Sequence, residues 1–342
     1  MKNNEKAQAK LEKAQAKAAA KAHKAAMKAL PQSAAKTPLA RLRRYVNFRR
    51  LLTLCMYLLL LDLVFVFLYP FLYMLVTSFK SQQDLDDVTV TWLLNTIDLS
   101  NYKLAFQVLN YPRRLLNTVI AVTLCTVGHV LSCAFIGYGF ARYNFRGKNF
   151  FFGALLLSMI VPTQTIIVPL YILFSNLGWI GTQLPVILPT FFGFGLKGAL
   201  FIFIFRQFFL SLPKSLEEAA YIDGCGAIRG YFRIAFPTSR SSVLVCIVLS
   251  MVWHWNDFFE PTLYLQEQSK YYLSLVLPTL SNLITNSSSG DLTSSGAGLE
   301  NLYTDATMMA AVTLTVLPIF VIYMFLQKQF MQGIETSGIT GE

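Results

Sequence analysis

The chain has 342 residues, 54% of them hydrophobic, and a mean hydropathy of +0.48. This composition excludes an ordinary soluble domain, because several runs reach the roughly 20 apolar residues that one helix needs to cross a bilayer. The formal net charge of +11 is local, since residues 1–50 carry a balance of +12 and the rest of the chain −1. A nucleic-acid-binding surface spread over a domain is therefore excluded.

Residues 1–50 form a basic N-terminal arm. Lysines recur in it at spacings of three and four from Lys6 to Lys28, so a helix would carry one basic stripe. Two interpretations stay open: a solvated, partly formed helix, or a helix lying near anionic lipid headgroups. The arm lacks the apolar core of a signal peptide, so we expect no cleaved targeting segment.

Six apolar runs follow the arm, and we predict that each spans the membrane. They cover residues 51–79, 115–138, 151–174, 184–208, 243–265 and 306–327. Prolines interrupt the third and fourth runs, and exposed backbone is tolerated in a membrane only where it faces protein or a water-filled cavity. Runs three to five are therefore expected to line a path for solute.

The flanking charges predict the orientation. One side of the predicted spans carries 23 Lys and Arg, including the N-terminal arm, and the other side carries five. The basic side is expected to be cytoplasmic. The predicted fold is an all-α polytopic membrane protein of six transmembrane helices with both termini inside. We expect a permease domain over 51–335, an external loop over 266–305 and a short tail over 336–342.

The segment 213–237 is a patterned polar stretch between two predicted spans. Ser215 and Glu218 have the spacing of a capping box, which predicts a helix beginning at Ser215. Ala219 and Ala220 would give that helix a closely approachable face, and Asp223-Gly224 would end it.

A second short helix is predicted after this turn, from Ala227 to Phe236, closed by Pro237. Its apolar stripe would consist of Ile228, Tyr231, Phe232 and Ala235. The whole segment is either a loop that packs on the protein's own helices or a preformed helical knob that docks into a groove of another protein.

Polar residues inside the predicted spans are functional candidates, because charged groups there are costly. The charged ones are Asp62, Lys197, Asp257 and Glu260, and the neutral ones are His129, Gln164, His254 and Asn256. Trp255, Asn256, Asp257 and Glu260 are either part of a sugar route or hydrogen-bonding groups between helices. For Lys197 we favour an ion pair with a carboxylate on a neighbouring helix over contact with an acidic substrate. Asp62 is expected to be structural or to face a partner subunit.

Catalysis is not expected of this chain. It has no P-loop motif, no metal-ligand cluster and no nucleophile–base pair. The five cysteines include no C-x-x-C motif, and four lie in apolar runs, so we expect small buried side chains and neither a disulfide framework nor a metal site.

The segment 213–237 resembles the EAA loop of the membrane permeases of binding-protein-dependent ABC importers. The motif positions are occupied by Glu218, Ala219, Ala220, Asp223, Gly224 and Pro237, while Arg240 stands where the family often has a second proline. The resemblance implies a type I importer architecture in which this loop is a coupling helix held in a cleft of the ATPase subunit.

The resemblance extends over roughly residues 50–335 and is to the carbohydrate-importer branch, the maltose-permease (MalG) type. It is carried by Asn117-Thr118, Gly137–Arg142, Phe145–Gly147, Ile160–Pro162, Pro169–Tyr171, Arg206–Phe209, Trp255–Phe258, Leu326–Phe330 and Gly333. Neither the N-terminal arm nor the 280–305 region belongs to the pattern.

This branch implies a subunit in the plasma membrane of a bacterium that passes a sugar or oligosaccharide. The implied partners are a second homologous permease, a cytoplasmic ABC ATPase dimer that binds ATP and Mg, and an extracellular substrate-binding protein. No cofactor is expected in this chain. The alternatives are an ABC permease for a non-sugar solute and a stand-alone secondary carrier, although a carrier predicts internal repeats that are not evident here.

Overall fold

The computed structural model describes residues 16–22, 24–25, 37–87, 89–278, 280–281 and 304–339, and every regular element among them is helical. The chain forms two compact units, Met1–Phe71 and Leu72–Glu342. Most of the predicted basic stripe between Lys6 and Lys28 lies outside the described residues. So does the Ser-, Asn- and Gly-rich part of the predicted external loop, over 285–299.

Helix α2 (Thr37–Ser78) contains the first predicted span, and the boundary between the two units falls within it. Its segment Arg49–Ser78 has a mean hydropathy of 2.6, which suits a membrane-crossing helix. Asp62 and Pro70 both lie inside this helix. The first predicted span, 51–79, is confirmed as a continuous helix that ends one residue early.

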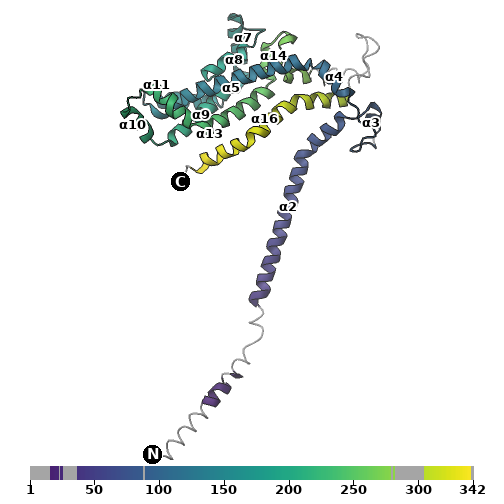
Figure 1. The fold of residues 1–342 in the computed structure, drawn as a ribbon, viewed down its shortest axis with the longest axis vertical. Helices are drawn as coiled ribbons and strands as arrows, with labels where there is room; N and C mark the ends of the chain where they lie inside the picture. Colours follow the sequence, from purple (N-terminus) through teal and green to yellow (C-terminus); the bar gives the residue numbers. More distant parts are fainter. Residues whose placement is uncertain are drawn as a thin grey trace, which may run out of the picture. The chain divides into compact units, whose positions relative to one another are not determined.

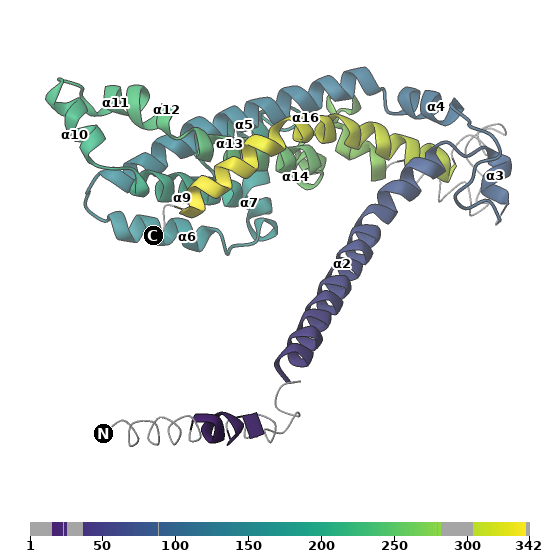
Figure 2. The same ribbon diagram turned by 60° about the horizontal axis from the view of Figure 1, so that its bottom comes forward.

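The second unit is a bundle of long helices that run side by side (Figures 1 and 2). Helix α5 (Tyr111–Arg142) packs most extensively on α9 (Gly195–Ser211) and α13 (Arg240–Asn256), and α13 packs on α16 (Asp305–Ile339). The second and sixth predicted spans are thus confirmed as helices, both longer than expected, because polar residues extend them beyond their apolar stretches.

Shorter elements connect these helices and flank them. Before α5 come α3 (Gln82–Asp86) and α4 (Ser100–Val108); between α5 and α9 come α6 (Lys148–Ser158), α7 (Thr163–Asn176), α8 (Leu184–Ile187) and the 3₁₀ turn η1 (Leu188–Phe192). Between α9 and α13 come α10 (Ser215–Ile222), α11 (Ala227–Gly230), the π-helical turn η2 (Tyr231–Ala235) and α12 (Phe236–Thr238). After α13 come α14 (Phe259–Tyr264), η3 (Gln268–Lys270) and η4 (Leu273–Leu275).

The largest apolar core lies where α5, α9 and α13 meet. Phe201, Phe205 and Phe209 of α9 are almost fully buried there. Gly137 of α5 permits the close approach, because a Cβ at this position would lie 2.8 Å from the Cβ of Phe205. The contact between these two helices therefore depends on a residue without a side chain.

Three predicted spans are interrupted. The third, 151–174, is wrong as one straight helix, because α6 and α7 meet at 101°. Pro162 has extended backbone angles and disfavours helix at the residue before it. The fourth, 184–208, is broken where Gly193 and Gly195 adopt positive φ angles, and the fifth, 243–265, is broken at Asp257, which is extended.

Four helical stretches of the described chain have the length and hydropathy of a membrane span: Arg49–Ser78, Tyr111–Arg142, Leu184–Ser211 and Asp305–Lys328. The bent pairs α6–α7 and Ala227–Thr238 with α13 raise the number to six if each counts as one span. The all-helical membrane architecture is thus confirmed, while the predicted six-span topology stays a prediction.

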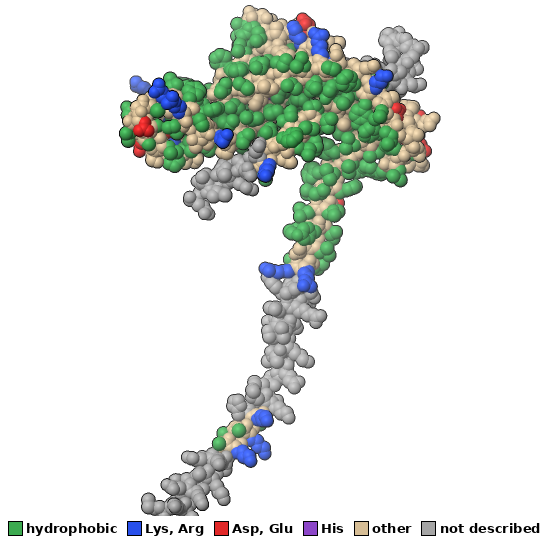
Figure 3. Space-filling view, in the orientation of Figure 1, with side chains coloured by type: hydrophobic (Ala, Val, Ile, Leu, Met, Phe, Trp, Pro, Cys, Tyr) green, Lys and Arg blue, Asp and Glu red, His purple; other side chains and the backbone are tan. Residues whose placement is uncertain are grey.

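Within the second unit, α10 and α11 lie at one end of the bundle and α3 and α4 at the other (Figures 1 and 2). Hydrophobic side chains cover the long face between these ends, and the charged ones gather mostly towards its rim (Figure 3). An apolar belt of this kind suits a lipid environment. The element α10–α12 therefore occupies a polar end of the bundle.

Candidate functional site

The connection between α9 and α13 holds the predicted coupling loop. The hydrogen bonds of helix α10 start one residue before the predicted first residue, Ser215. The N–H groups of Glu217 and Glu218 both donate to the carbonyl oxygen of Lys214. Lys214 has helical backbone angles and no side chain caps this end. The predicted capping box of Ser215 and Glu218 is therefore wrong, because Ser215 lies inside the helix that a turn at Pro213 has already started.

The predicted stop at Gly224 is confirmed. Gly224 has φ +79°, its N–H bonds to the carbonyl oxygen of Tyr221, and the next N–H, of Cys225, bonds back to Ala220. These two bonds make a Schellman motif, which satisfies carbonyl groups that the end of α10 would otherwise leave open. Asp223 is the C-cap residue of α10. The reversal of the chain after α10 is thus fixed by local chemistry.

The second half of the loop differs from the single helix predicted over Ala227–Phe236. It is helical through α11, π-helical through η2 and helical again in α12, so that Pro237 lies near the start of α12 and does not end the helix. Proline is tolerated in a first helical turn. The chain bends by 74° before α13, after Thr238.

The predicted apolar stripe of this second half is split between two faces. Tyr231 and Ala235 are buried in the α5–α9–α13 core, whereas Ile228 and Phe232 are exposed. The π-helical turn rotates the chain relative to a regular helix, which separates residues that a period of 3.6 would align. Tyr231 therefore anchors the loop in the bundle core.

Five apolar side chains of the loop are exposed. Ile222 is 84% exposed and Tyr221 78%, and Leu216, Ile228 and Phe232 are exposed as well. We call these five residues the loop patch. Of the two alanines of the motif, Ala220 is buried against the protein and Ala219 is exposed. Large exposed apolar residues at a polar end of a membrane protein are typical of a protein–protein contact.

Arg142, the last residue of α5, contacts the beginning of this loop on both sides of Pro213. Its Nε lies 2.8 Å from Oε1 of Glu217, and its Nη2 donates a hydrogen bond of 2.8 Å to the carbonyl oxygen of Leu212. The side chains of Arg142 and Glu217 are 5% and 27% exposed. We call these contacts the Arg142 clamp. Because Leu212 follows α9 and Glu217 lies in the first turn of α10, one guanidinium joins three helices.

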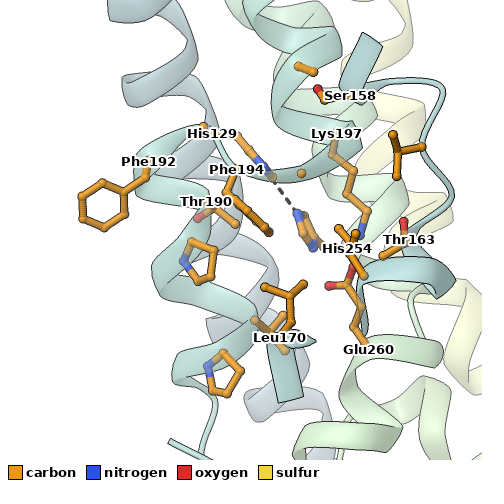
Figure 4. A pocket seen from close by; sticks show the side chains of 18 of the residues that line it. His129, Ser158, Thr163, Leu170, Thr190, Phe192, Phe194, Lys197, His254 and Glu260 are labelled. Atoms are coloured by element: carbon orange, nitrogen blue, oxygen red, sulfur yellow. Dashed lines mark hydrogen bonds between the residues drawn. The ribbon is translucent and has the colours of Figure 1, made fainter. Parts of the chain in front are cut away.

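A cavity of about 550 Å³ lies inside the second unit. Residues of α6, α7, α8, η1 and the start of α9 line it, together with His129 of α5, His254 of α13 and Glu260 of α14 (Figure 4). These segments include the interrupted spans that were expected to line a path. Its volume falls in the range of sites for small molecules, about 300–1,000 Å³.

Lys197 forms the ion pair that the sequence favoured. Its Nζ lies 2.8 Å from Oδ2 of Asp257, which connects the start of α9 to the break between α13 and α14. The other carboxylate oxygen, Oδ1, accepts a weak hydrogen bond of 3.4 Å from the N–H of Glu260. The side chains are 22% and 11% exposed, so the pair is mostly buried.

Glu260 and two histidines complete the polar lining of the cavity. The Glu260 carboxyl and the Lys197 ammonium both point into the space beside His254 (Figure 4). Nε2 of His254 lies 3.3 Å from Nδ1 of His129, and the two rings stack. Nδ1 of His254 and Nε2 of His129 are buried without a hydrogen-bond partner among the described residues.

The other predicted path residues lie outside this cavity. Trp255 is buried between helices and its Nε1 donates to the carbonyl oxygen of Thr315, which is the helix-packing role that was the alternative to sugar contact. Asn256 donates to the carbonyl oxygen of Val252 on its own helix. Gln164 is exposed on α7 and does not line the cavity.

The sequence analysis did not find the Arg142 clamp. Its two ionic partners are 75 positions apart, and the only signal was a basic residue in the short loop after a predicted span.

Known proteins are similar to this chain over most of its length. Residues 134–336 match the family model described as binding-protein-dependent transport system inner membrane component. The arabinooligosaccharides transport system permease protein of Halalkalibacterium halodurans is 28% identical over 282 residues, which are 82% of this chain and 93% of that protein. A probable ABC transporter permease protein of Pyrococcus horikoshii is 33% identical over 220 residues, which are 62% of this chain and 77% of that protein.

Solved structures share the fold. Among them is the crystal structure of a bacterial ABC transporter involved in the import of the acidic polysaccharide alginate. One of its chains has a TM-score of 0.69 and 22% identity, over 82% of this chain and 97% of the other.

Proposed function

Because this chain belongs to the binding-protein-dependent transport system inner membrane components, we propose that it is a permease subunit of an ATP-driven importer for a sugar or an oligosaccharide. The arabinooligosaccharide permease that it resembles supports a saccharide substrate. The chain itself is a transport subunit, and a separate ATPase dimer binds ATP and Mg and supplies the energy. The complex lies in the plasma membrane of a bacterium.

The loop patch docks into the ATPase. Helix α10 is short, ends in a Schellman turn and is held by the Arg142 clamp, and Tyr231 of η2 anchors the following segment in the core. We therefore treat α10 as a rigid element at the end of the bundle. A preformed helix loses little conformational entropy when it enters a groove. Closure of the ATPase dimer then moves the bundle helices as rigid bodies. The exposed loop patch on this anchored helix is the observation that carries the proposal.

Two further partners complete the transporter. Six predicted helices do not enclose a path alone, so a second homologous permease pairs with this one. An extracellular substrate-binding protein delivers the sugar at the end of the bundle that holds α3 and α4, opposite the loop. The distribution of 23 basic residues against five supports this orientation. Lys197, Asp257 and Glu260 belong to the sugar path inside the membrane.

The experiment is copurification of the ATPase with tagged variants of this chain from membranes. Ile222→Glu places a charge in the loop patch and is expected to lower the ATPase yield at least about tenfold, since a charge desolvated at an interface costs more than 1.4 kcal/mol. Leu93→Glu makes the same change at a residue 86% exposed and outside the loop, and it should leave the yield unchanged. Equal ATPase yield from both variants would contradict the docking role.

Two variants test transport itself. Gly224→Pro destroys the Schellman turn, because proline cannot adopt φ +79°, and Glu218→Lys reverses a charge on the exposed side of α10. Both should abolish sugar uptake while the protein still inserts into the membrane. Normal uptake by either inserted variant would refute coupling through this loop.

A further inference from the structure

We propose that the cavity admits neutral saccharides and discriminates against acidic ones such as uronates or sugar phosphates. This inference rests on the proposed function and narrows its substrate class. The inference depends on the charged side chains that line the cavity or contact its lining. Among the described residues these are Lys197, Asp257 and Glu260, one cation and two carboxylates.

The single cation of this set is already neutralised by a carboxylate. Lys197 Nζ is 2.8 Å from Asp257 Oδ2, within charge-assisted hydrogen-bonding distance. An acidic substrate that contacted Lys197 would have to share the ammonium with Asp257, whose side chain is only 11% exposed. Two anions around one ammonium would repel each other in a site of low dielectric, which is unfavourable.

Glu260 adds a carboxyl group that faces the cavity. No described residue donates a hydrogen bond to this carboxyl or forms an ion pair with it, whereas the backbone N–H of Glu260 is directed to Asp257 Oδ1. A carboxylate oxygen accepts hydrogen bonds from hydroxyl groups and repels a second carboxylate or a phosphate. The open acceptor in the cavity therefore selects for hydroxyl-rich neutral molecules.

The rest of the lining agrees with this chemistry. Phe174, Phe194 and Tyr264 supply apolar aromatic surface, and the hydroxyl groups of Thr163 and Thr190 supply neutral polar contacts. A few polar groups set in a mostly apolar cavity are typical of small-molecule sites.

The test measures initial uptake rates of two probes into vesicles that contain the complete transporter with its ATPase and binding protein. The probes are arabinotriose, a neutral trisaccharide, and trigalacturonate, an acidic one. We expect the neutral probe to enter at least about tenfold faster, which corresponds to about 1.4 kcal/mol. A faster rate for trigalacturonate would overturn the inference. Uptake of neither probe by a transporter that hydrolyses ATP would overturn the proposed sugar function itself.

Variants of this chain distinguish selection by the cavity from selection by the binding protein, because the binding protein stays the same in all of them. Asp257→Asn leaves Lys197 without its carboxylate and should lower the ratio of neutral to acidic uptake at least about threefold, because the ammonium can then pair with an acidic substrate. Lys197→Met combined with Asp257→Asn removes both charges and should restore the ratio. An unchanged ratio in the correctly inserted Asp257→Asn transporter would show that the cavity does not select by charge.

The carboxyl of Glu260 has its own matched comparison. Glu260→Gln keeps the shape and removes the charge, and it should raise the rate for trigalacturonate relative to arabinotriose. Glu267→Gln makes the same change on a side chain 61% exposed and outside the cavity, and its ratio should equal that of the unchanged protein. Equal ratios for both variants would contradict the role of Glu260.

Discussion

Removal of either ionic partner of the Arg142 clamp is expected to destabilise the loop and to uncouple ATP hydrolysis from transport. Glu217→Gln leaves the guanidinium of Arg142, which is 5% exposed, without its counter-charge. Breaking a fully buried pair in this way costs about 3–5 kcal/mol. Because water reaches Glu217, which is 27% exposed, we expect about 2–4 kcal/mol for this variant. Arg142→Met also removes the donor to the Leu212 carbonyl and should cost a similar amount.

The double variant decides whether these costs belong to one interaction. Arg142→Met with Glu217→Gln removes both charges, so no unpaired charge remains and the total should fall short of the sum by about 1–3 kcal/mol. The exposed pair of Lys270 and Glu267 offers a matched cycle within the same chain, with side chains 38% and 61% exposed. Its coupling energy should be about 0–1 kcal/mol.

Two assays measure the effect. Denaturant unfolding of the purified protein in detergent gives the coupling energy, and reconstituted transporter gives the number of sugar molecules moved per ATP hydrolysed. In the Glu217→Gln transporter, hydrolysis should persist while the sugar moved per ATP falls. Additive costs within about 0.5 kcal/mol, or an unchanged ratio of sugar to ATP, would refute the reasoning.

Three smaller predictions follow from backbone geometry and from the N-terminal arm. Gly224→Ala should cost about 1–2 kcal/mol and lower uptake only partly, since a Cβ would meet open space but φ is +79°; full loss of uptake would contradict this. Gly128→Ala should lower the free energy of unfolding by about 1–3 kcal/mol, because its Cβ would lie 2.2 Å from Thr190 Oγ1, whereas Gly139→Ala, with nothing within 4 Å, should not; equal stabilities would refute the contact. Deletion of residues 1–29 should leave uptake rates within about twofold, since the arm lies outside the permease pattern; loss of uptake would show that it is needed.

Features set by short-range chemistry could be predicted from the sequence. The stop of α10 at Gly224 follows from a residue that alone adopts φ +79° readily, and the structure confirms it. The long apolar helices follow in the same way from length and hydropathy. The capping box of Ser215 failed although its pattern was present, because Pro213 and Lys214 began the turn earlier. A local motif predicts a helix start only to within about one or two residues.

For features that depend on tertiary packing, the sequence predicted at most the type of interaction and not the residues that form it. A carboxylate partner for Lys197 was expected from the cost of a lone charge in a membrane, but which of the candidate carboxylates would fill the role was open. The Arg142 clamp depends on the arrival of α10 beside the end of α5, which no single-sequence pattern encodes. The burial of Trp255 likewise depends on α16, which comes 50 residues later.

The most direct test is uptake of radiolabelled arabinotriose into vesicles that contain this chain with its partner permease and binding protein, measured with and without the ATPase. We predict accumulation only when the ATPase and ATP are both present, and none when the ATPase is added to the Gly224→Pro permease. Accumulation against a gradient without the ATPase would contradict the account, because α10 would then transmit no force from a partner.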